Sequence, residues 1–196
     1  RRFMQLMGDM NETLAAAGNQ FLMYVDRPNN YEAWDIDPGH MEQESPCAPA
    51  KSCKVVEQLP LRVGVMYERE IGRASTMKQV VRLAADARRL EFHCEADWHE
   101  SHRLLKVAFP VNFFKLKATY EMQFGSVERP THFNTRYDIA RYEVPGHKWA
   151  DLSEHGFGVA LLPESKSAFT PPDKVTRRTL PRQPNPPDPH PTKAPP

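Results

Sequence analysis

The sequence lacks the features that mark several large classes of protein. Its 26 Lys and Arg residues nearly balance 25 Asp and Glu residues, so the net charge of +1 gives no strong attraction to nucleic acid or to an anionic membrane. No apolar run approaches the ~18 residues that a membrane span requires. The N-terminal residues lack the continuous apolar core of a signal peptide. We therefore expect no nucleic-acid or membrane partner, and the cytoplasm is favoured while the compartment stays open.

Cysteine is scarce as well. The three cysteines, Cys47, Cys53 and Cys94, are too few and too scattered for a disulfide framework. Free thiols in a cytosolic protein are the favoured interpretation, and a Cys47–Cys53 disulfide in a secreted protein is the alternative. Hydrophobic residues make up 40% of the 196 residues, which is typical of a soluble globular protein. The length predicts one domain with an appendage.

Alternation of apolar and polar residues is the main structural signal. One candidate strand places Leu90, Phe92, Cys94, Ala96 and Trp98 on one face and acidic and His residues on the other. Similar alternation or apolar character occurs at 21–25, 61–66, 105–111, 118–124, 137–144 and 157–162. Six or more short strands with polar connections predict a mostly β protein, an antiparallel β-sandwich. The predicted core contains Phe92, Cys94, Trp98, Val107, Phe109, Tyr120, Phe124 and Val159.

Composition divides the chain into three parts. Residues 1–20 form an N-terminal segment with helical spacing of Leu6, Met10 and Leu14, and residues 21–168 form the sandwich. Residues 38–53 are expected to be a loop. Ten of the 19 prolines fall in 171–196, and proline cannot donate to a β ladder, so 169–196 is predicted to be a Pro-rich, disordered tail.

Five blocks of sequence carry a family resemblance. They are Gly18–Gln20 with Asp26–Asp37; Leu90–Glu100 with Leu104–Val111; Tyr120–Gly125 with Arg129–Thr135; Ala140–Val144 with His147–Glu154; and Gly156–Leu162. In order and spacing they resemble the C-terminal region of α-mannosidases of glycoside hydrolase family 38. The resemblance covers about residues 18–166. It implies a fragment of a galactose-mutarotase-like supersandwich, and it favours a strand for 76–89, although the composition of that segment is helix-forming.

The resemblance also implies what this chain does not carry. The family's zinc ligands and catalytic carboxylates lie in an N-terminal domain, and none of them matches a residue here. We therefore assign no catalytic residue and no metal ligand, expect no cofactor in this chain, and expect zinc in the full-length enzyme. Whether the chain is itself an enzyme stays open. After Leu162 the sequence departs from the family, with Arg177, Arg178 and Pro181 where a strand is expected, as in an incomplete or decayed copy.

Candidate carbohydrate-binding residues lie among polar and aromatic side chains. They are Arg129, His132, Asn134, Trp149, His99 and Glu100. An aromatic face can stack on a sugar ring, and a loop with Arg, His and Asn can donate hydrogen bonds to sugar hydroxyls. Each residue also has a structural interpretation, such as an Arg129–Glu100 ion pair. The polar side chains of 93–99 have ligand-like spacing on one strand face, but a solvated sheet face explains them better.

Three functions follow from these observations. The first is a non-catalytic C-terminal β-sandwich module of an α-mannosidase, which packs on the catalytic domain of that enzyme and is associated with mannose-containing oligosaccharides. The second is an independent carbohydrate-binding module, or a non-functional relic. The third and weakest is a small metalloenzyme that uses His93, His99 and His102.

Overall fold

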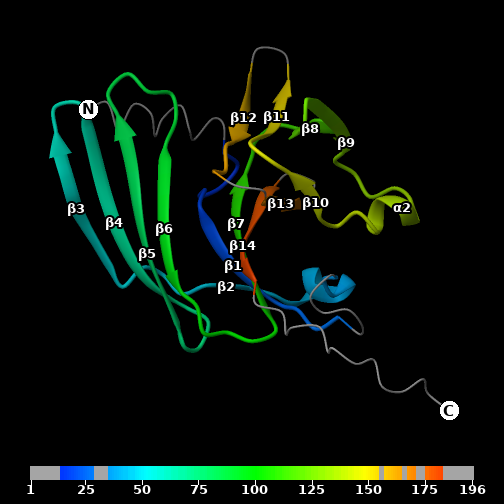
Figure 1. Ribbon diagram of the computed structural model, residues 1–196, viewed down its shortest axis with the longest axis horizontal. Helices are drawn as coiled ribbons and strands as arrows, with labels where there is room; N and C mark the ends of the chain where they lie inside the picture. Colours follow the sequence, from blue (N-terminus) through cyan, green and yellow to red (C-terminus); the bar gives the residue numbers. More distant parts are fainter. Residues whose placement is uncertain (1–13, 29–34, 155–156, 165–166, 171–174, 183–196) are drawn as a thin grey trace.

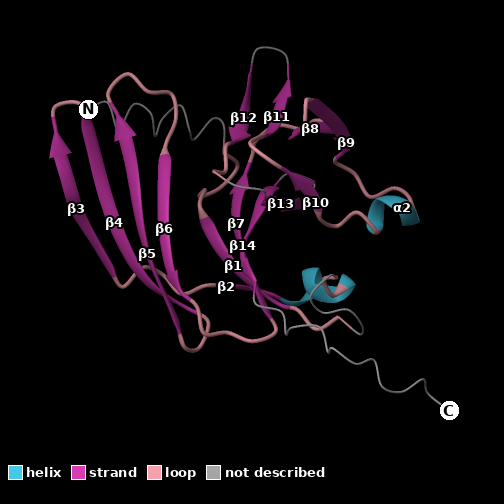
Figure 2. Cartoon of the chain, in the orientation of Figure 1, coloured by secondary structure: helices cyan, strands magenta, loops and turns pink. Residues whose placement is uncertain are grey.

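The computed structural model describes residues 14–28, 35–154, 157–164, 167–170 and 175–182, and they form three antiparallel β-sheets (Figure 1). Helix is confined to two short turns, η1 (Pro38–Gln43) and α2 (Arg136–Ile139), in the described residues (Figure 2). No helix in these ranges has the length and apolar character needed to cross a membrane. The expectation of a mostly β, antiparallel protein is therefore confirmed.

The first sheet has the strand order β10-β13-β14-β7-β1-β2 and runs through the middle of the molecule. Its strands are β1 (Gln20–Val25), β2 (Glu44–Pro46), β7 (Arg103–Pro110), β10 (Val144–Gly146), β13 (Ser167–Thr170) and β14 (Val175–Arg182). The second sheet has the order β12-β11-β8-β9, with β8 (Lys117–Met122), β9 (Gly125–Pro130), β11 (Ala150–Glu154) and β12 (Phe157–Leu161). The third has the order β3-β4-β5-β6, with β3 (Ser52–Leu59), β4 (Arg62–Ile71), β5 (Ser75–Ala84) and β6 (Glu91–Asp97).

Strand β7 is buried on both faces, which explains its nearly continuous apolar sequence. Leu105 and Val107 join Phe21 of β1 and Met77 of β5 in a core between the first and third sheets. Leu104 and Ala108 point to the opposite face, where they pack with Leu22 and Tyr24 beneath η1. Because period-two alternation gives β7 two buried faces, Lys106 on the second face is also fully buried.

A separate core lies between the second sheet and the strands β10 and β13. Its buried members are Val111, Ala118, Tyr120, Val144, Ala150, Leu152 and Phe169. The rings of Tyr120 and Phe169 are tilted against each other with centroids 5.8 Å apart. Val127 and Val159 pack on its margin. This core holds β9 and the start of β10 in place, and these two segments flank the pocket described below.

The third sheet lies to one side of the first and packs on it through the core described above, but its edge strand β6 is exposed throughout (Figure 1). The predicted core is therefore wrong at Phe92, which is 38% exposed, and at Cys94, which is also exposed. Phe92 still contacts Phe109 edge-on, with ring centroids 5.7 Å apart. Phe124 is fully exposed because it has φ of +62° at the β8–β9 turn rather than lying within a strand. Strand alternation correctly predicts Val107 and Tyr120, whereas Phe109, Trp98 and Val159 are partly buried.

Several element predictions need correction. Residues 137–144 are not a strand: a capping box between Thr135 and Asp138 starts the short helix α2, and β10 begins only at Val144. The expected loop at 38–53 contains η1 and β2. Residues 75–84 are a strand, as the resemblance implied, and not a helix. The three cysteines are free, so the alternative of a Cys47–Cys53 disulfide is not formed. The N-terminal helix falls largely on residues 1–13, outside the described residues.

The prediction of a disordered tail from residue 169 is wrong at the end of β13 (Ser167–Thr170) and throughout β14 (Val175–Arg182). Strand β14 pairs antiparallel with β7 and with β13, so it is an internal strand of the first sheet. Arg177 lies opposite Ala108, and Arg178 lies opposite both Val107 and Phe169. An irregularity in register falls between Thr179 and Arg182, around Pro181, whose missing N–H cannot join the ladder. Residues 183–196 lie outside the described residues.

Candidate functional site

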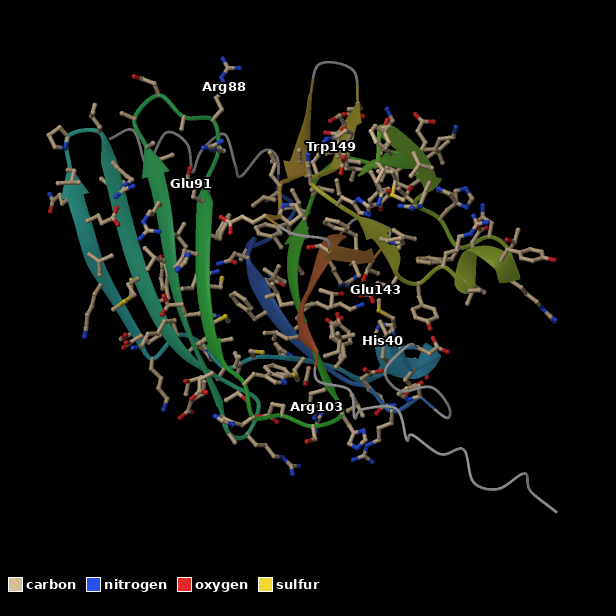
Figure 3. The ribbon with its side chains drawn as sticks, viewed as in Figure 1. His40, Arg88, Glu91, Arg103, Glu143 and Trp149 are labelled. Carbon is tan, nitrogen blue, oxygen red and sulfur yellow. The ribbon has the colours of Figure 1, made fainter. Side chains whose placement is uncertain are left out.

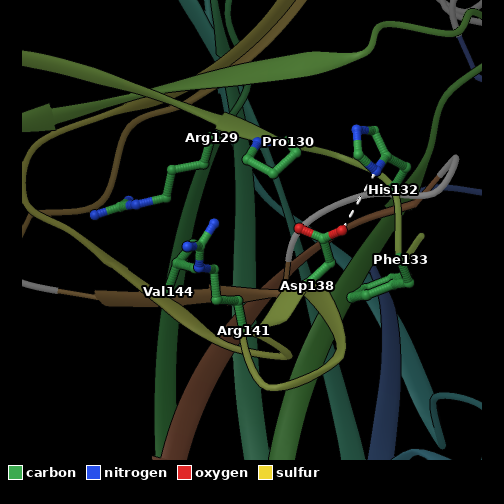
Figure 4. A pocket seen from close by; sticks show the side chains of 7 residues that line it. All are labelled: Arg129, Pro130, His132, Phe133, Asp138, Arg141 and Val144. Carbon is green, nitrogen blue, oxygen red and sulfur yellow. Dashed lines mark ion pairs between the residues drawn. The ribbon is translucent and has the colours of Figure 1, made fainter. Parts of the chain in front are cut away.

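A small pocket lies where the end of β9 meets the segment that contains α2 (Figure 4). Its lining consists of Arg129, Pro130, His132, Phe133, Asp138, Arg141 and Val144. The structure therefore brings together two of the predicted carbohydrate-binding residues, Arg129 and His132. It adds Asp138 and Arg141, which sequence reasoning did not select. The resulting pocket contains two guanidinium groups, an imidazole and one carboxylate.

Arg129 is held in place by three contacts. Its Nη1 donates to the carbonyl oxygen of Pro145 at 2.7 Å, and its Nη2 lies 3.8 Å from the Met122 sulfur. The guanidinium carbon lies 4.9 Å from the centroid of the Tyr120 ring, in a cation–π contact. Burial lowers the pKa of Arg129, the phenol of Tyr120 opposes the effect, and the positive charge of Arg141 adds to the lowering. The Arg129 cation is thus ordered, partly desolvated and close to a second cation.

The carboxylate of Asp138 is already occupied by local structure. It accepts hydrogen bonds from the Thr135 backbone N–H at 3.0 Å and from the Thr135 hydroxyl at 2.8 Å. These hydrogen bonds lower the pKa of Asp138. Its Oδ2 also lies 3.8 Å from Nδ1 of His132 (Figure 4). Asp138 therefore caps α2, and the nearby His132 and Arg141 add to the lowering of its pKa, so this one carboxylate faces both arginines of the lining.

The other predicted binding residues lie elsewhere. Asn134 is exposed beside the pocket but does not line it. Trp149 is half-buried near the second sheet, where its carbonyl accepts from the Glu121 N–H at 3.0 Å (Figure 3). His99 is exposed, and its Nε2 lies 2.9 Å from Asp97. The six candidates therefore do not form one site in the described structure.

Glu100 has a structural role at the turn between β4 and β5. Its Oε1 accepts from the backbone N–H groups of Arg73 at 2.7 Å and Ala74 at 2.8 Å, and from the Ser75 hydroxyl at 3.1 Å. Burial would raise the pKa of Glu100, but these hydrogen bonds outweigh it and hold the pKa below its ordinary value. Gly72 has φ of +73°, and a side chain there would collide with the Glu100 carboxylate. The predicted Arg129–Glu100 pair is not formed, since each residue has other partners.

Among the described residues no group of three His, Cys, Asp or Glu side chains is placed to hold a metal ion. His93 contacts Glu95 at 3.3 Å and His99 contacts Asp97, so each His of the exposed strand face is paired with an acid two residues away. His102 has φ of +51° at the turn before β7. In the described residues these histidines therefore do not form the metal site that a small metalloenzyme would need.

Sequence reasoning missed a buried polar cluster beneath η1. Lys106 of β7 is fully buried, and its Nζ lies 3.1 Å from Glu143 Oε1, 3.0 Å from His40 Nε2 and 2.9 Å from Thr170 Oγ1. Glu143 also accepts a hydrogen bond from the Thr179 hydroxyl. The cluster thus connects β7, β13 and β14 with the segments that carry η1 and Glu143 (Figure 3).

The hydrogen bonds assign one tautomer to His40. Its Nδ1 lies 2.7 Å from the Asp37 carbonyl, which can only accept, so Nδ1 carries the proton. Nε2 is then free to accept from Lys106. Burial lowers the pKa of His40, and the neighbouring Lys106 charge lowers it further. Burial also lowers the pKa of Lys106, while Glu143 opposes that effect. The sequence signal for this cluster is a Lys inside the apolar run of β7.

Comparison with known proteins places this fold among parts of larger enzymes. Residues 4–190 match the profile described as "Glycosyl hydrolases family 38 C-terminal domain". The chain is 41% identical over 174 residues to Alpha-mannosidase 2C1 of Homo sapiens, covering 88% of this chain and 17% of that protein. It is 38% identical over 158 residues to Alpha-mannosidase G of Dictyostelium discoideum, covering 78% and 14%. With Alpha-mannosidase of Saccharomyces cerevisiae the identity is 35% over 179 residues, covering 88% and 16%.

The crystal structure of an alpha-mannosidase from Enterococcus faecalis V583 superimposes with a TM-score of 0.67 at 12% identity, covering 83% of this chain and 22% of that chain. This likeness concerns the fold. The chain spans only 17% of the human relative, so it corresponds to one part of a much longer protein. The profile match over nearly all of the sequence shows that the chain belongs to the glycosyl hydrolases family 38 C-terminal domain family.

Proposed function

We propose that this chain serves as the C-terminal β module of an α-mannosidase and acts by packing on the catalytic domain of that enzyme. The observation that carries the proposal is the family match over residues 4–190, together with the small share of each relative that the chain covers. We further propose that the sheets form part of a galactose-mutarotase-like supersandwich. In this proposal the chain supports mannoside hydrolysis but does not perform it.

Exposed apolar side chains support a role in packing against another part of the enzyme. On the β3–β4 hairpin, Val55, Leu59 and Leu61 are 65%, 57% and 75% exposed. Near the pocket, Tyr137 and Ile139 of α2 are 80% and 59% exposed. Apolar side chains that gather on a surface mark interaction sites in soluble proteins. Burial of such groups against a catalytic domain would stabilise the full enzyme by about 25 cal/mol per Å² of apolar surface.

The chemistry expected of the full enzyme needs residues from outside this chain. A retaining glycosidase uses two carboxyl groups about 5 Å apart, one as nucleophile and one as acid and base. No residue of this chain is proposed for either role. We accordingly predict that the purified chain does not hydrolyse an aryl α-mannoside, with or without added zinc. Zinc-dependent turnover that a chelator abolishes would contradict this prediction.

A chimaera tests the proposed function directly. In human Alpha-mannosidase 2C1, the 174 residues that match this chain are replaced by the corresponding residues of this chain. We expect the chimaera to hydrolyse an aryl α-mannoside, whereas the human enzyme with the segment deleted, or replaced by an unrelated β domain, is inactive or insoluble. A soluble chimaera without activity would count against the proposal, because the module would then fail to complete the enzyme.

Carbohydrate binding by the module itself is a second candidate function. The observation that favours it is the placement of Arg129 and His132 in one pocket. Titration of the chain with a mannose-containing oligosaccharide, followed by NMR, tests this function. Saturable shifts at the pocket that are lost in His132→Ala would support it, and an unchanged spectrum would exclude this pocket as a sugar site.

A further inference from the structure

The pocket in Figure 4 has more positive charge than its surroundings neutralise. Arg141 is exposed, and among the described residues neither Arg129 nor Arg141 forms an ion pair within 4 Å. Asp138 is the only carboxylate in the lining, and its single negative charge balances only one of the two guanidinium charges. The second guanidinium charge has no counter-ion among the lining residues, and an anion placed between the two arginines would relieve their mutual repulsion.

The geometry suits a planar oxyanion. Arg129 uses Nη1 for the Pro145 carbonyl, and its position is fixed by the Tyr120 ring, so its remaining donors are held in a defined orientation. Arg141 follows α2, and its guanidinium extends toward the same side of the pocket as that of Arg129 (Figure 4). Guanidinium groups bind carboxylates and phosphates through paired N–H donors, and such charge-assisted hydrogen bonds are among the stronger ones in proteins.

The residues around the two arginines favour one source for such an oxyanion. Phe133, Tyr137 and Ile139 beside the pocket are 41%, 80% and 59% exposed. A charged pair bordered by aromatic and aliphatic side chains is typical of a protein interface, where Arg and aromatic residues are enriched. Resting on the proposed function, we infer that the Arg129–Arg141 pair is an oxyanion site, and that in the full enzyme its ligand is a carboxylate side chain from the remainder of the α-mannosidase polypeptide.

The first test uses the full chain by itself. The Arg side-chain N–H signals are followed by NMR during titration with sodium acetate and with sodium phosphate, against sodium chloride at matched ionic strength. We expect saturable shifts for Arg129 and Arg141, which Arg141→Gln weakens about tenfold or more through loss of a charge-assisted pair. Arg136→Gln is the matched control, because Arg136 is exposed on α2 and does not line the pocket. It should leave the shifts unchanged.

The second test identifies the source of the oxyanion in the chimaera. Arg141→Gln should lower the thermal midpoint of the chimaera but leave that of the isolated chain nearly unchanged. This result would support a carboxylate side chain of the enzyme as the ligand of the two arginines. If Arg141→Gln alters neither midpoint while the isolated chain still binds phosphate, the carboxylate assignment is overturned and the ligand is a free anion. The oxyanion site itself would be overturned if acetate and phosphate produced the same shifts as chloride. It would also be overturned if mannose produced shifts at the pocket and acetate did not. The inactivity of the chimaera, by contrast, concerns only the proposed function.

Discussion

Replacement of Lys106 by Met tests how the buried cluster beneath η1 stabilises the fold. Methionine retains an unbranched side chain of similar length, so the apolar stem still packs among Leu104, Ala108 and Tyr24. The substitution removes the ammonium group that lies 3.1 Å from Glu143 and 2.9 Å from Thr170. The perturbation is therefore mainly electrostatic.

The magnitude follows from the burial of the partner that is left behind. The Glu143 side chain is only 8% exposed, and without Lys106 its charge keeps a hydrogen bond from Thr179 but no ion pair in the cluster. His40 Nε2 loses its donor as well. Breaking a buried pair by removal of one partner costs about 3–5 kcal/mol. For a chain of this size each kcal/mol lowers the thermal midpoint by about 2–4 °C, so we expect a fall on the order of 10 °C.

Two further variants separate charge from packing. Lys106→Met combined with Glu143→Gln removes both charges, and we expect it to be more stable than Lys106→Met alone, with a coupling of about 2 kcal/mol. Lys117→Met is the control for an exposed pair, because Lys117 lies 3.0 Å from Glu128 with both side chains more than half exposed. It should cost less than about 1 kcal/mol.

Urea unfolding followed by circular dichroism measures these variants and Glu143→Gln alone, because the coupling is the difference between the double variant and the sum of the two single variants. The reasoning is refuted if Lys106→Met costs less than about 1 kcal/mol, since no buried charge would then be left without its partner. It is equally refuted if the double variant shows no coupling, because Lys106 and Glu143 would then act independently.

The other predictions concern separate parts of the fold. Gly72→Ala should cost more than about 1 kcal/mol in urea unfolding, because of its positive φ and the collision with Glu100, and Gly125→Ala, with open space around it, should cost less. The folded state keeps the pKa of His40 below 6.5, so it binds fewer protons than the unfolded chain; stability should fall as the pH drops from 7.5 to 5.5, and His40→Gln should flatten that profile. Truncation after Thr170 removes β14 and should lower the thermal midpoint by more than about 5 °C; an unchanged midpoint would show that β14 contributes little.

Local patterns in the sequence were sufficient for the strands with one clear alternation. Strand β1, strand β12 and the apolar residues of β7 lie where the sequence pattern predicted. Successive side chains of a strand point to opposite faces, and this local property does not depend on which element packs against either face. The family resemblance correctly favoured a strand for β5, where composition alone indicated a helix. Arg129 and His132 could be selected because polar residues flank a turn with Pro130.

Tertiary structure decided which of these faces meets a neighbour. Phe92 and Cys94 alternate as a buried strand would, yet β6 is an exposed edge, and no local pattern shows whether a second sheet covers a face. Strand β14 contains Pro181 and three arginines, but pairing with β7 and β13 on either side holds it in the first sheet. Lys106 and Glu143 are 37 positions apart in the printed sequence, so their contact arises only when β7 and the segment after α2 come together. Arg141 joins the pocket for the same reason.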